Sequence, residues 1–308
     1  MITLIASIIA GLVALFVGGE LLVRGAVAIA HRLGISNLVT GVVIVGAATS
    51  MPEMVASVDA ALIGSPGIAW GNVVGSNLAN SLLILGTTAI VAPIAMHGVG
   101  KRDAVVGLIA TLAIWALTVS QLASPWIGVA LLASLVVYII WRVNHPPEDA
   151  GGEEEDNEPS LPIALLLFLG GVAVLIGGGR LLVSGAVELA TIAGISEAVI
   201  GLTVVAIGTS LPELAATLAA ALKGRADLAV GNVVGSNVYN LLLISGATMA
   251  IAPMPVPSEL LNIEFPILAV SSVVILLLCR YARHIGRGIG ALLLAAFAVN
   301  TALAFVWL

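Results

Sequence analysis

The sequence predicts an all-α integral membrane protein of about ten transmembrane helices, built as two inverted repeats of five helices each. Three observations predict this class. Of the 308 residues, 60% are apolar and 9% are charged, and the mean hydropathy is +1.18. Apolar runs of the ~20 residues that cross a bilayer recur along the whole chain. The first half of the sequence also returns in the second half at a fixed offset.

The low charge content requires that lipid cover much of the surface. A soluble domain carries about 25% charged residues, which this chain lacks. The net charge of −6 argues neither for nor against nucleic acid, and we expect none as a partner. The single cysteine, Cys279, excludes an internal disulfide. The first segment has no basic region or cleavage site, so we expect it to be a retained helix.

Ten apolar segments are long enough to span the bilayer, five on each side of an acidic stretch. They cover residues 2–30, 37–63, 67–92, 104–120, 124–142, 161–190, 197–222, 228–252, 262–280 and 286–307. The domains are therefore a first five-helix repeat at 1–143, an acidic linker at 144–160 and a second, inverted five-helix repeat at 161–308. We expect the linker to be solvated rather than to form a regulatory calcium-binding loop, because it has no EF-hand spacing.

Lysine and arginine positions predict the orientation. Cytoplasmic loops of membrane proteins carry an excess of these residues. Ten of the eleven fall at helix ends or loops on one side of the expected arrangement, and only Arg180, inside the sixth segment, is left over. That side is expected to be cytoplasmic. The chain would then be a multi-pass protein of the cell inner (plasma) membrane, with both termini outside and the linker inside.

The internal repeat has an offset of 160 residues and needs no gap from residue 18 to residue 93. GGELLVRGAV at 18–27 matches GGRLLVSGAV at 178–187, TSMPE at 49–53 matches TSLPE at 209–213, and GNVVGSN at 71–77 recurs at 231–237. Because five helices is an odd number, the second copy enters the membrane from the opposite side. Inverted repeats of this kind are usual in secondary transporters, whose sites lie near the midplane. A purely structural duplication is the alternative.

Glu53 and Glu213 lie near the middle of the second and seventh segments. A charged residue at the centre of a spanning helix costs ~2.5–3.5 kcal/mol on insertion scales. Two such costs indicate function, and the repeat places the two carboxylates opposite each other. The alternative is a neutral, protonated pair packed between helices.

Oxygen donors accompany each carboxylate. A threonine and a serine lie four and three residues before it, on the same helix face. They are Thr49 and Ser50 in the first repeat, and Thr209 and Ser210 in the second. A proline directly before each glutamate lacks an N–H, which frees a backbone carbonyl nearby. The third and eighth segments add Ser76, Asn80, Ser236 and Asn240. Interhelical hydrogen bonding is the alternative role for these serines and asparagines.

These donors are all oxygen atoms, which suits Ca²⁺ and Na⁺. No histidine or cysteine joins them, so zinc and copper are not expected. No resident cofactor is expected. An intramembrane enzyme would need a nucleophile with a base or a metal-bound water, which the pattern does not offer. We therefore do not expect an enzyme.

The two motifs TSMPE and TSLPE, each followed by GNVVGSN, resemble the α-repeats of the cation/calcium exchanger superfamily. They are most similar to those of prokaryotic sodium/calcium exchangers. The resemblance covers nearly the whole chain. It implies ten helices in inverted repeats, with alternating access by sliding of the first and sixth helices. It also implies a role for each site residue. Glu53 and Glu213 would bind Ca²⁺ and share the Na⁺ sites, and Thr49 and Thr209 would give backbone carbonyls to Ca²⁺. The hydroxyls for Na⁺ would come from Ser50, Ser210, Ser76 and Ser236. Ala206 would give a backbone carbonyl, as could its counterpart Gly46.

The sequence departs from the family pattern at residue 240. Asn240 stands where archaeal sodium/calcium exchangers carry Asp, so the centre keeps two carboxylates and the stoichiometry is open. Ala48 also replaces the motif glycine that Gly208 keeps in the second repeat. Asp59, beyond Glu53, has no acidic counterpart, and it has either a role in ion access or a simple interfacial role.

The leading functional interpretation is a secondary antiporter that exchanges Ca²⁺ for Na⁺ by alternating access. An H⁺/Ca²⁺ antiporter is the nearest alternative, with Glu53 and Glu213 protonated instead of sodium-loaded. Relatives of that kind usually carry a glutamate in the Gly-Asn motifs, and GNVVGSN has none. An ion-binding channel or sensor is a further alternative. The expected partners are Ca²⁺, Na⁺ and the lipid bilayer, for a chain that we take as a monomer.

The orientation can be tested with cysteines introduced at Asp156 and Leu308. In intact cells, an impermeant thiol reagent should label position 308 and leave position 156 unlabelled. The unsubstituted protein controls for labelling of Cys279. Labelling at 156 but not at 308 would reverse the orientation.

Overall fold

The computed structural model describes residues 2–33, 46–96, 100–120, 122–145, 159–222, 224 and 226–307. Within these residues, eight helices are long and apolar enough to cross a membrane, and one bent helix pair raises the number to nine. The remaining predicted segment, 37–63, begins outside the described part, and its described portion is helical from Gly46. The all-α membrane fold predicted from the sequence is therefore confirmed.

The helices follow the predicted segments within a few residues. The first repeat contains α1 (Ile2–Arg32), α3 (Gly46–Thr49), α4 (Met51–Leu62), α5 (Pro66–Leu78), η2 (Ala79–Ile84), α6 (Leu85–Val91), β1 (Ile94–Ala95), α7 (Lys101–Val119) and α8 (Pro125–Asn144). The second contains α9 (Leu161–Ala193), α10 (Glu197–Ile200), η3 (Gly201–Val205), α11 (Ala206–Thr209), α12 (Leu211–Leu222), α13 (Ala226–Tyr239), η4 (Asn240–Ile244), α14 (Ser245–Ile251), η5 (Leu260–Glu264), α15 (Phe265–Tyr281), β2 (His284–Ile285) and α16 (Arg287–Trp307).

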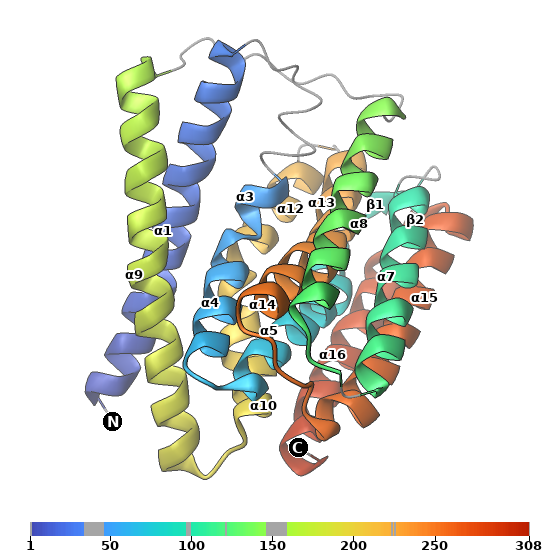
Figure 1. Cartoon of the computed structure of the whole chain (residues 1–308). Coiled ribbons are helices and arrows are strands. Elements are labelled where there is room, and N and C mark those ends of the chain that lie inside the picture. The colour runs from blue at the N-terminus through green and yellow to red at the C-terminus, as the bar shows by residue number, and fades with distance from the viewer. Residues whose placement is uncertain are drawn as a thin grey trace.

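The chain begins and ends at the same edge of the molecule, as an even number of spans requires (Figure 1). At the opposite edge, the guanidinium of Arg32 donates hydrogen bonds of 3.2 and 2.9 Å to the carbonyl of Pro159. These bonds join the end of α1 to the start of α9. The two repeats also interlock, since α8 of the first packs on α14 of the second and α16 packs on α6.

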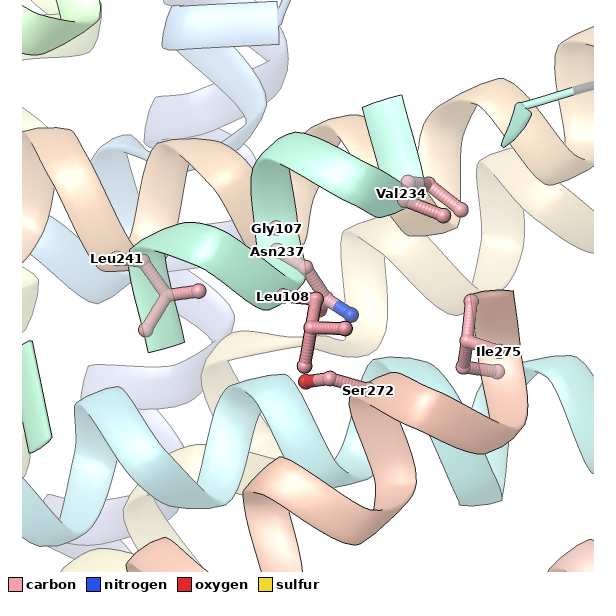
Figure 2. Close-up of a pocket in the computed structure, with 8 residues that line it drawn as sticks. Gly107, Leu108, Val234, Asn237, Leu241, Ser272 and Ile275 are labelled. Carbon is pink, nitrogen blue, oxygen red and sulfur yellow. The ribbon is translucent and has the colours of Figure 1, made fainter. Parts of the chain in front are cut away.

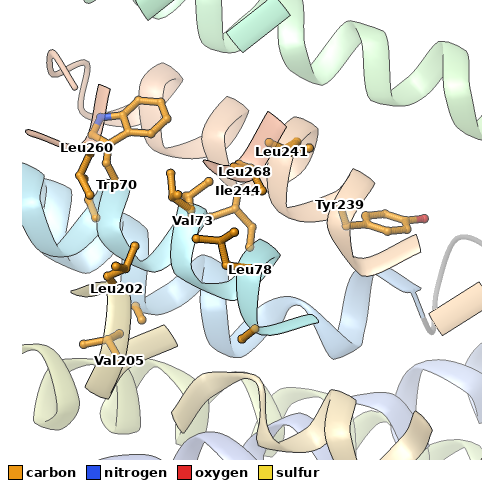
Figure 3. Packing of buried hydrophobic residues seen from close by; sticks show 14 of the residues in the cluster. Trp70, Val73, Leu78, Leu202, Val205, Tyr239, Leu241, Ile244, Leu260 and Leu268 are labelled. Atoms are coloured by element: carbon orange, nitrogen blue, oxygen red, sulfur yellow. The ribbon is translucent and has the colours of Figure 1, made fainter. Parts of the chain in front are cut away.

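Two spans form the centre of the molecule. The span from Pro66 to Val91 is 83% buried and that from Leu228 to Ile251 is 72% buried, whereas no other single-helix span exceeds 44%. Figure 3 shows α5 between η3 and η4, with Trp70 and Leu78 among the buried side chains. Both central spans change from α-helix to a π-helical turn, at η2 and η4. Such turns are rare and occur often at functional sites.

Serine and proline break the second and seventh spans. Ser50 has φ −85° and ψ 5°, and Ser210 has φ −86° and ψ 7°. Pro52 then lies in the first turn of α4. The second break bends the seventh span by 43°. Proline lacks an N–H and crowds the preceding turn, which gives the physical cause of both breaks.

Helices α1 and α9 lie side by side and contact each other along most of their length (Figure 1). Glycines at seven-residue intervals form the contact: Gly11, Gly18 and Gly25 in α1, and Gly171, Gly178 and Gly185 in α9. A Cβ atom on Gly171 would lie 2.5 Å from the backbone nitrogen of Leu22, and one on Gly25 would lie 2.5 Å from that of Phe168. Small residues at such contacts let helix backbones approach closely inside membranes.

Adjacent glycines of α9 test this contact. Gly171→Ala should lower the thermal unfolding midpoint in detergent by several degrees, because overpacking costs ~1–3 kcal/mol. Gly170→Ala is the matched control, since a Cβ at Gly170 meets nothing within 4 Å. Alanine is also the better helix former by ~1 kcal/mol, so Gly170→Ala should leave the midpoint unchanged or raise it. Equal effects of the two substitutions would contradict this packing.

Candidate functional site

The two carboxylates lie deep in the protein at equivalent positions. Glu53 and Glu213 occupy the first turns of α4 and α12, directly after the two helix breaks, and each is 1% exposed. Helix α4 packs against η4 of the other repeat, and α12 packs against η2. Each carboxylate-bearing helix therefore contacts the π-helical turn that carries the asparagine of the opposite repeat.

A hydrogen bond joins the two repeats at the site. The Ser210 hydroxyl donates to Glu53 Oε1 at 3.1 Å. The sequence prediction that the two carboxylate motifs meet is consistent with this bond.

Several buried oxygens of this cluster have no hydrogen-bond partner within the described part of the chain. They are Ser50 Oγ, Glu53 Oε2, both carboxylate oxygens of Glu213, and the side-chain oxygens of Asn80 and Asn240. Buried polar atoms almost always have partners, so a group of unpartnered acceptors requires an explanation. Acceptors from both repeats, including two carboxylates, are suited to a hard cation.

Two asparagines that the sequence analysis did not select hold the glutamate turns in place. Asn72 Nδ2 donates to the Glu53 carbonyl at 3.0 Å and to Ser57 Oγ at 2.8 Å. Its Oδ1 accepts hydrogen bonds from Thr209 Oγ1 at 3.2 Å and from Ser76 Oγ at 3.4 Å. Asn72 thus connects α4, α5 and α11.

Asn232 repeats this arrangement in the second half. Its Nδ2 donates to the Glu213 carbonyl at 3.3 Å and to Thr217 Oγ1 at 2.8 Å. Both asparagines stand second in GNVVGSN, and each follows its glutamate by 19 residues. Their duplication was the sequence signal that could have identified them.

Most of the predicted site residues are buried. Those below 5% exposure are Ser50, Glu53, Ser76, Asn80, Ala206, Thr209, Ser210, Glu213, Ser236 and Asn240. Thr49 is half-buried. Gly46 begins α3, but its surroundings are outside the described part.

Thr209 and Ala206 are already engaged by protein groups. The single proton of the Thr209 hydroxyl has two acceptors within reach besides Asn72 Oδ1, the carbonyls of Val205 and Ala206 at 3.0 and 3.3 Å. This leaves the Thr209 hydroxyl committed, which is compatible with a role through its backbone carbonyl. The Ala206 carbonyl accepts a second hydrogen bond from the backbone nitrogen of Ser210 at 3.1 Å, so it would have to exchange a protein donor for a cation.

Asp59 and Arg180 lie outside this cluster. Asp59 is half-buried on α4, and Arg180 is exposed on α9. The two helices touch nearby, where Gly179 meets Val55. Arg180, which the charge bias left unexplained, therefore belongs to the helix that packs against the one carrying Asp59.

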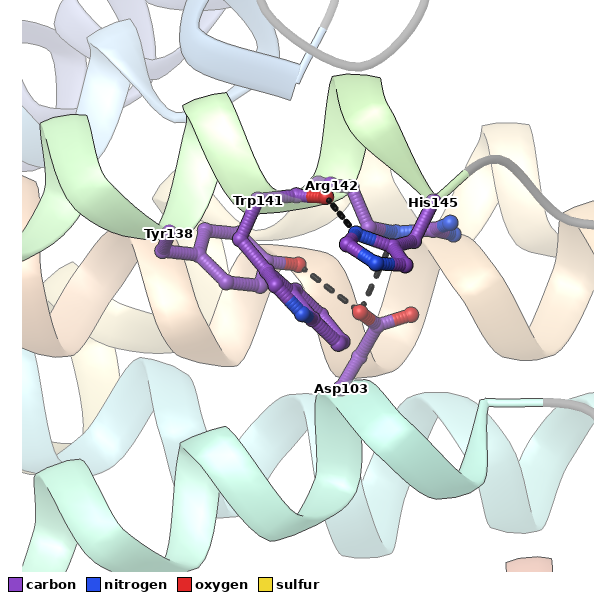
Figure 4. A network of polar contacts seen from close by, with 5 residues as sticks. All are labelled: Asp103, Tyr138, Trp141, Arg142 and His145. Atoms are coloured by element: carbon purple, nitrogen blue, oxygen red, sulfur yellow. Dashed lines mark hydrogen bonds and ion pairs between the residues drawn. The ribbon is translucent and has the colours of Figure 1, made fainter.

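A second network of charged groups ties α7 to α8 (Figure 4). Asp103 Oδ1 lies 3.1 Å from Arg142 Nε and accepts a hydrogen bond of 3.1 Å from the Tyr138 hydroxyl. Trp141 stacks on His145 with ring centroids 5.6 Å apart. The charges of Asp103 and Arg142 pair with each other, so this network braces two helix ends.

The hollow in Figure 2 is also separate from the carboxylates. It lies between α7, α13 and α15, and its lining includes Leu108, Asn237 and Ser272. Asn237 Nδ2 donates to Ser81 Oγ at 2.8 Å. Neither Glu53 nor Glu213 lines this hollow, so it is not the cation site.

Known proteins resemble this chain over nearly its full length. A family model described as sodium/calcium exchanger protein matches residues 3–144 and 163–306. The inner membrane protein YrbG of Escherichia coli is 33% identical over 317 residues, with 98% of this chain and 97% of the relative covered. The sodium/calcium exchanger MaX1 of Methanosarcina acetivorans is 28% identical over 327 residues, with 92% and 93% covered. A solved structure of the sodium-calcium exchanger NCX_Mj, soaked with Na⁺ and no Ca²⁺, superposes with a TM-score of 0.69 at 32% identity and covers 98% of this chain and 99% of its own.

The role of Asn72 can be tested by its stability effect. Asn72→Ala removes the two hydrogen bonds that the Asn72 amide donates and leaves the Ser76 hydroxyl without this acceptor, and each unsatisfied buried group costs ~1–3 kcal/mol. It should therefore lower the unfolding midpoint, measured without added cations, by far more than Asn77→Ala. Asn77 is a matched control in the same helix, because within the described residues its amide donates to the Val73 carbonyl of that helix, at 2.8 Å, and to no other element. Similar midpoints for the two variants would show that Asn72 does not hold the site together.

Proposed function

This chain belongs to the sodium/calcium exchanger protein family, and we propose that it is an antiporter in which Ca²⁺ and Na⁺ compete for one site between the two repeats. The observation that carries the proposal is the pair of buried carboxylates, Glu53 and Glu213, surrounded by unpartnered oxygens from both repeats.

Charge balance explains why one site would serve both ions. Two ionised carboxylates neutralise one Ca²⁺ or two Na⁺. Ca²⁺ takes ~6–8 oxygen ligands, so neutral hydroxyls, amides and carbonyls must complete its shell. The serine, threonine and asparagine side chains around the carboxylates provide such ligands. Ions that need the same two charges exclude each other, and this exclusion couples the two fluxes.

The α1/α9 pair provides the means of alternating access. It borders the site, since α1 contacts α3 and α11 while α9 contacts α4. The pair lies off the two-fold axis: α9 packs along α4, whereas the equivalent contact of α1 with α12 is slight. Sliding the pair until α1 packs along α12 would produce the opposite state by the symmetry of the repeat. With the orientation proposed from the arginines and lysines, the α9–α4 contact closes the outer side.

Sodium is favoured over protons as the exchanged ion for two reasons. Hydroxyl groups from Ser50 and Ser210 lie with the carboxylates, and Na⁺ needs such neutral oxygens whereas a proton does not. Asn240 also replaces a potential third carboxylate with an amide. Ca²⁺ would use these neutral ligands in either kind of exchange, but of the two exchanged ions only Na⁺ would use them as well.

The driving ion can be tested in proteoliposomes that contain the purified protein. An outward Na⁺ gradient at fixed pH should drive Ca²⁺ uptake, and a pH gradient without Na⁺ should not. Uptake driven by the pH gradient alone would establish the proton-coupled alternative.

The same assay ranks substitutions of the site residues by how much Ca²⁺ uptake each one removes. Glu53→Gln and Glu213→Gln should each reduce uptake by roughly 100-fold or more. Each removes a carboxylate that would neutralise the bound cation, and removing one partner of a buried pair of opposite charges costs ~3–5 kcal/mol. Asn80→Ala and Asn240→Ala should cost roughly fivefold, since water can replace an amide oxygen and a hydrogen bond contributes ~1 kcal/mol. Asn240→Asp should remain active but become more sensitive to acid, because adjacent carboxylates compete for a proton. Glu259→Gln, at an exposed position, is the control. Near-normal uptake by either central glutamine variant would remove the basis of the site.

A further inference from the structure

A third carboxylate is fully buried in the membrane region, away from the exchange site. Glu264 ends η5, in the ninth span, and is 0% exposed. Its Oε2 accepts a hydrogen bond of 3.1 Å from Asn300 Nδ2 of α16, in the tenth span. Asn300 is itself 7% exposed. A single side-chain pair thus joins the last two spans.

This pair is not part of the duplicated site. Both residues lie beyond 178–253, the part of the second repeat that matches the first without a gap. The function of Glu264 must therefore be argued from its own surroundings.

Within the described part of the chain, no charged side chain of the helices around η5 lies close enough to neutralise Glu264. Elements α5, α7 and α15 contact η5, and α16 carries Asn300. Helix α5 has no charged residue. The charged residue of α15 is Arg280, which follows Glu264 by 16 residues, or about 24 Å along a helix. The charged residue of α16 is Arg287, which precedes Asn300 by 13 residues, or about 20 Å along a helix.

The charges of α7 lie at that far end as well. They are Lys101, Arg102 and Asp103. A Cβ on Gly100, just before them, would lie 3.6 Å from Cys279 Sγ near the end of α15. Cys279 and Tyr281, the other titratable groups of α15, also lie at this end. Among the residues that the structure describes, Glu264 therefore has an amide partner but no cationic one.

Two oxygens of the pair remain without partners in the described structure: Glu264 Oε1 and Asn300 Oδ1. Both are acceptors when the carboxyl is ionised. A proton on Oε1 converts that oxygen into a donor, and Asn300 Oδ1 is an acceptor on the same amide group that already bonds Oε2. A protonated acid and an amide can close a ring of two hydrogen bonds, O–H to the amide oxygen and N–H to the acid carbonyl, and the second of these bonds is the one present between Asn300 and Glu264.

We propose that Glu264 is a proton-binding site that stays occupied at neutral pH, and that the neutral acid pairs with Asn300 to fasten η5 to α16. The bound proton is structural and is not exchanged for Ca²⁺. An ionised carboxylate in this place would be buried without a counter-charge, which is far more costly than a buried neutral acid with both hydrogen bonds made. The proposal does not depend on which ion drives transport.

Infrared difference spectroscopy of the purified protein tests the proposal directly. The difference between wild type and Glu264→Gln should show the loss of one protonated carboxylic C=O band, present unchanged from pH 6 to 8. Asn300→Leu should keep this band and move it to higher frequency, because the acid loses its hydrogen bonds. The Asn300→Leu spectrum does not require that the glutamine variant fold. Glu259→Gln, five residues earlier and exposed, is the matched control and should instead lose an ionised carboxylate band.

Stability and transport separate a structural proton from a transported one. Glutamine resembles the neutral acid in shape and can form the same ring with Asn300. Glu264→Gln should therefore leave the unfolding midpoint unchanged and keep the rate of Na⁺-driven Ca²⁺ uptake within twofold of wild type. Asn300→Leu should lower the unfolding midpoint. Loss of an ionised carboxylate band in Glu264→Gln at pH 7 would overturn the proposal. So would a loss of uptake in Glu264→Gln with an unchanged midpoint, since that would make the proton part of transport.

Discussion

The structure depends on one constraint: two carboxylates must be kept in the interior of a membrane protein without a permanent counter-charge. Glu53 and Glu213 are both 1% exposed, and within the described residues only Oε1 of Glu53 has a side-chain partner, the Ser210 hydroxyl. Such groups are costly in a bilayer unless a cation or a proton accompanies them. The helix breaks, the π-helical turns and the asparagines beneath the glutamates all lie next to these carboxylates, where the proposed site would need neutral oxygens for a cation.

Duplication solves this constraint economically, because one motif supplies half of the site twice. Asn72 and Asn232 make equivalent bonds to the carbonyl of the glutamate 19 residues earlier. The symmetry is broken where the two sides of the membrane must differ. Helix α9 packs along α4, while α1 touches α12 only slightly, so the glycine-faced pair lies to one side of the axis. The proposed alternating access uses this asymmetry, because moving the pair would open a site made of two equivalent halves to the other side.

The sequence alone predicted the span order, the repeat and the two central glutamates, because each depends on local apolar length, on self-similarity or on a rare charge at helix centre. It also singled out the two prolines, Pro52 and Pro212, for their missing N–H, and the helix breaks lie just before them. The π-helical turns at Asn80 and Asn240 were not predictable, since no local signal distinguishes them from α-helix. The Glu264–Asn300 pair was missed for another reason. Its partners are 36 residues apart and meet only through the packing of two spans.

Competition at equilibrium tests the central claim that Ca²⁺ and Na⁺ use the same two carboxylates. The measurement is the Kd of radioactive Ca²⁺ for the purified protein at fixed pH, over a range of Na⁺ concentrations. A shared site predicts that the apparent Kd rises without limit as Na⁺ increases, and with a power of Na⁺ greater than one, because more than one Na⁺ must leave before Ca²⁺ takes both charges. A Kd that reaches a plateau, or that Na⁺ does not change, would mean that the two ions bind together at separate sites and would contradict this account.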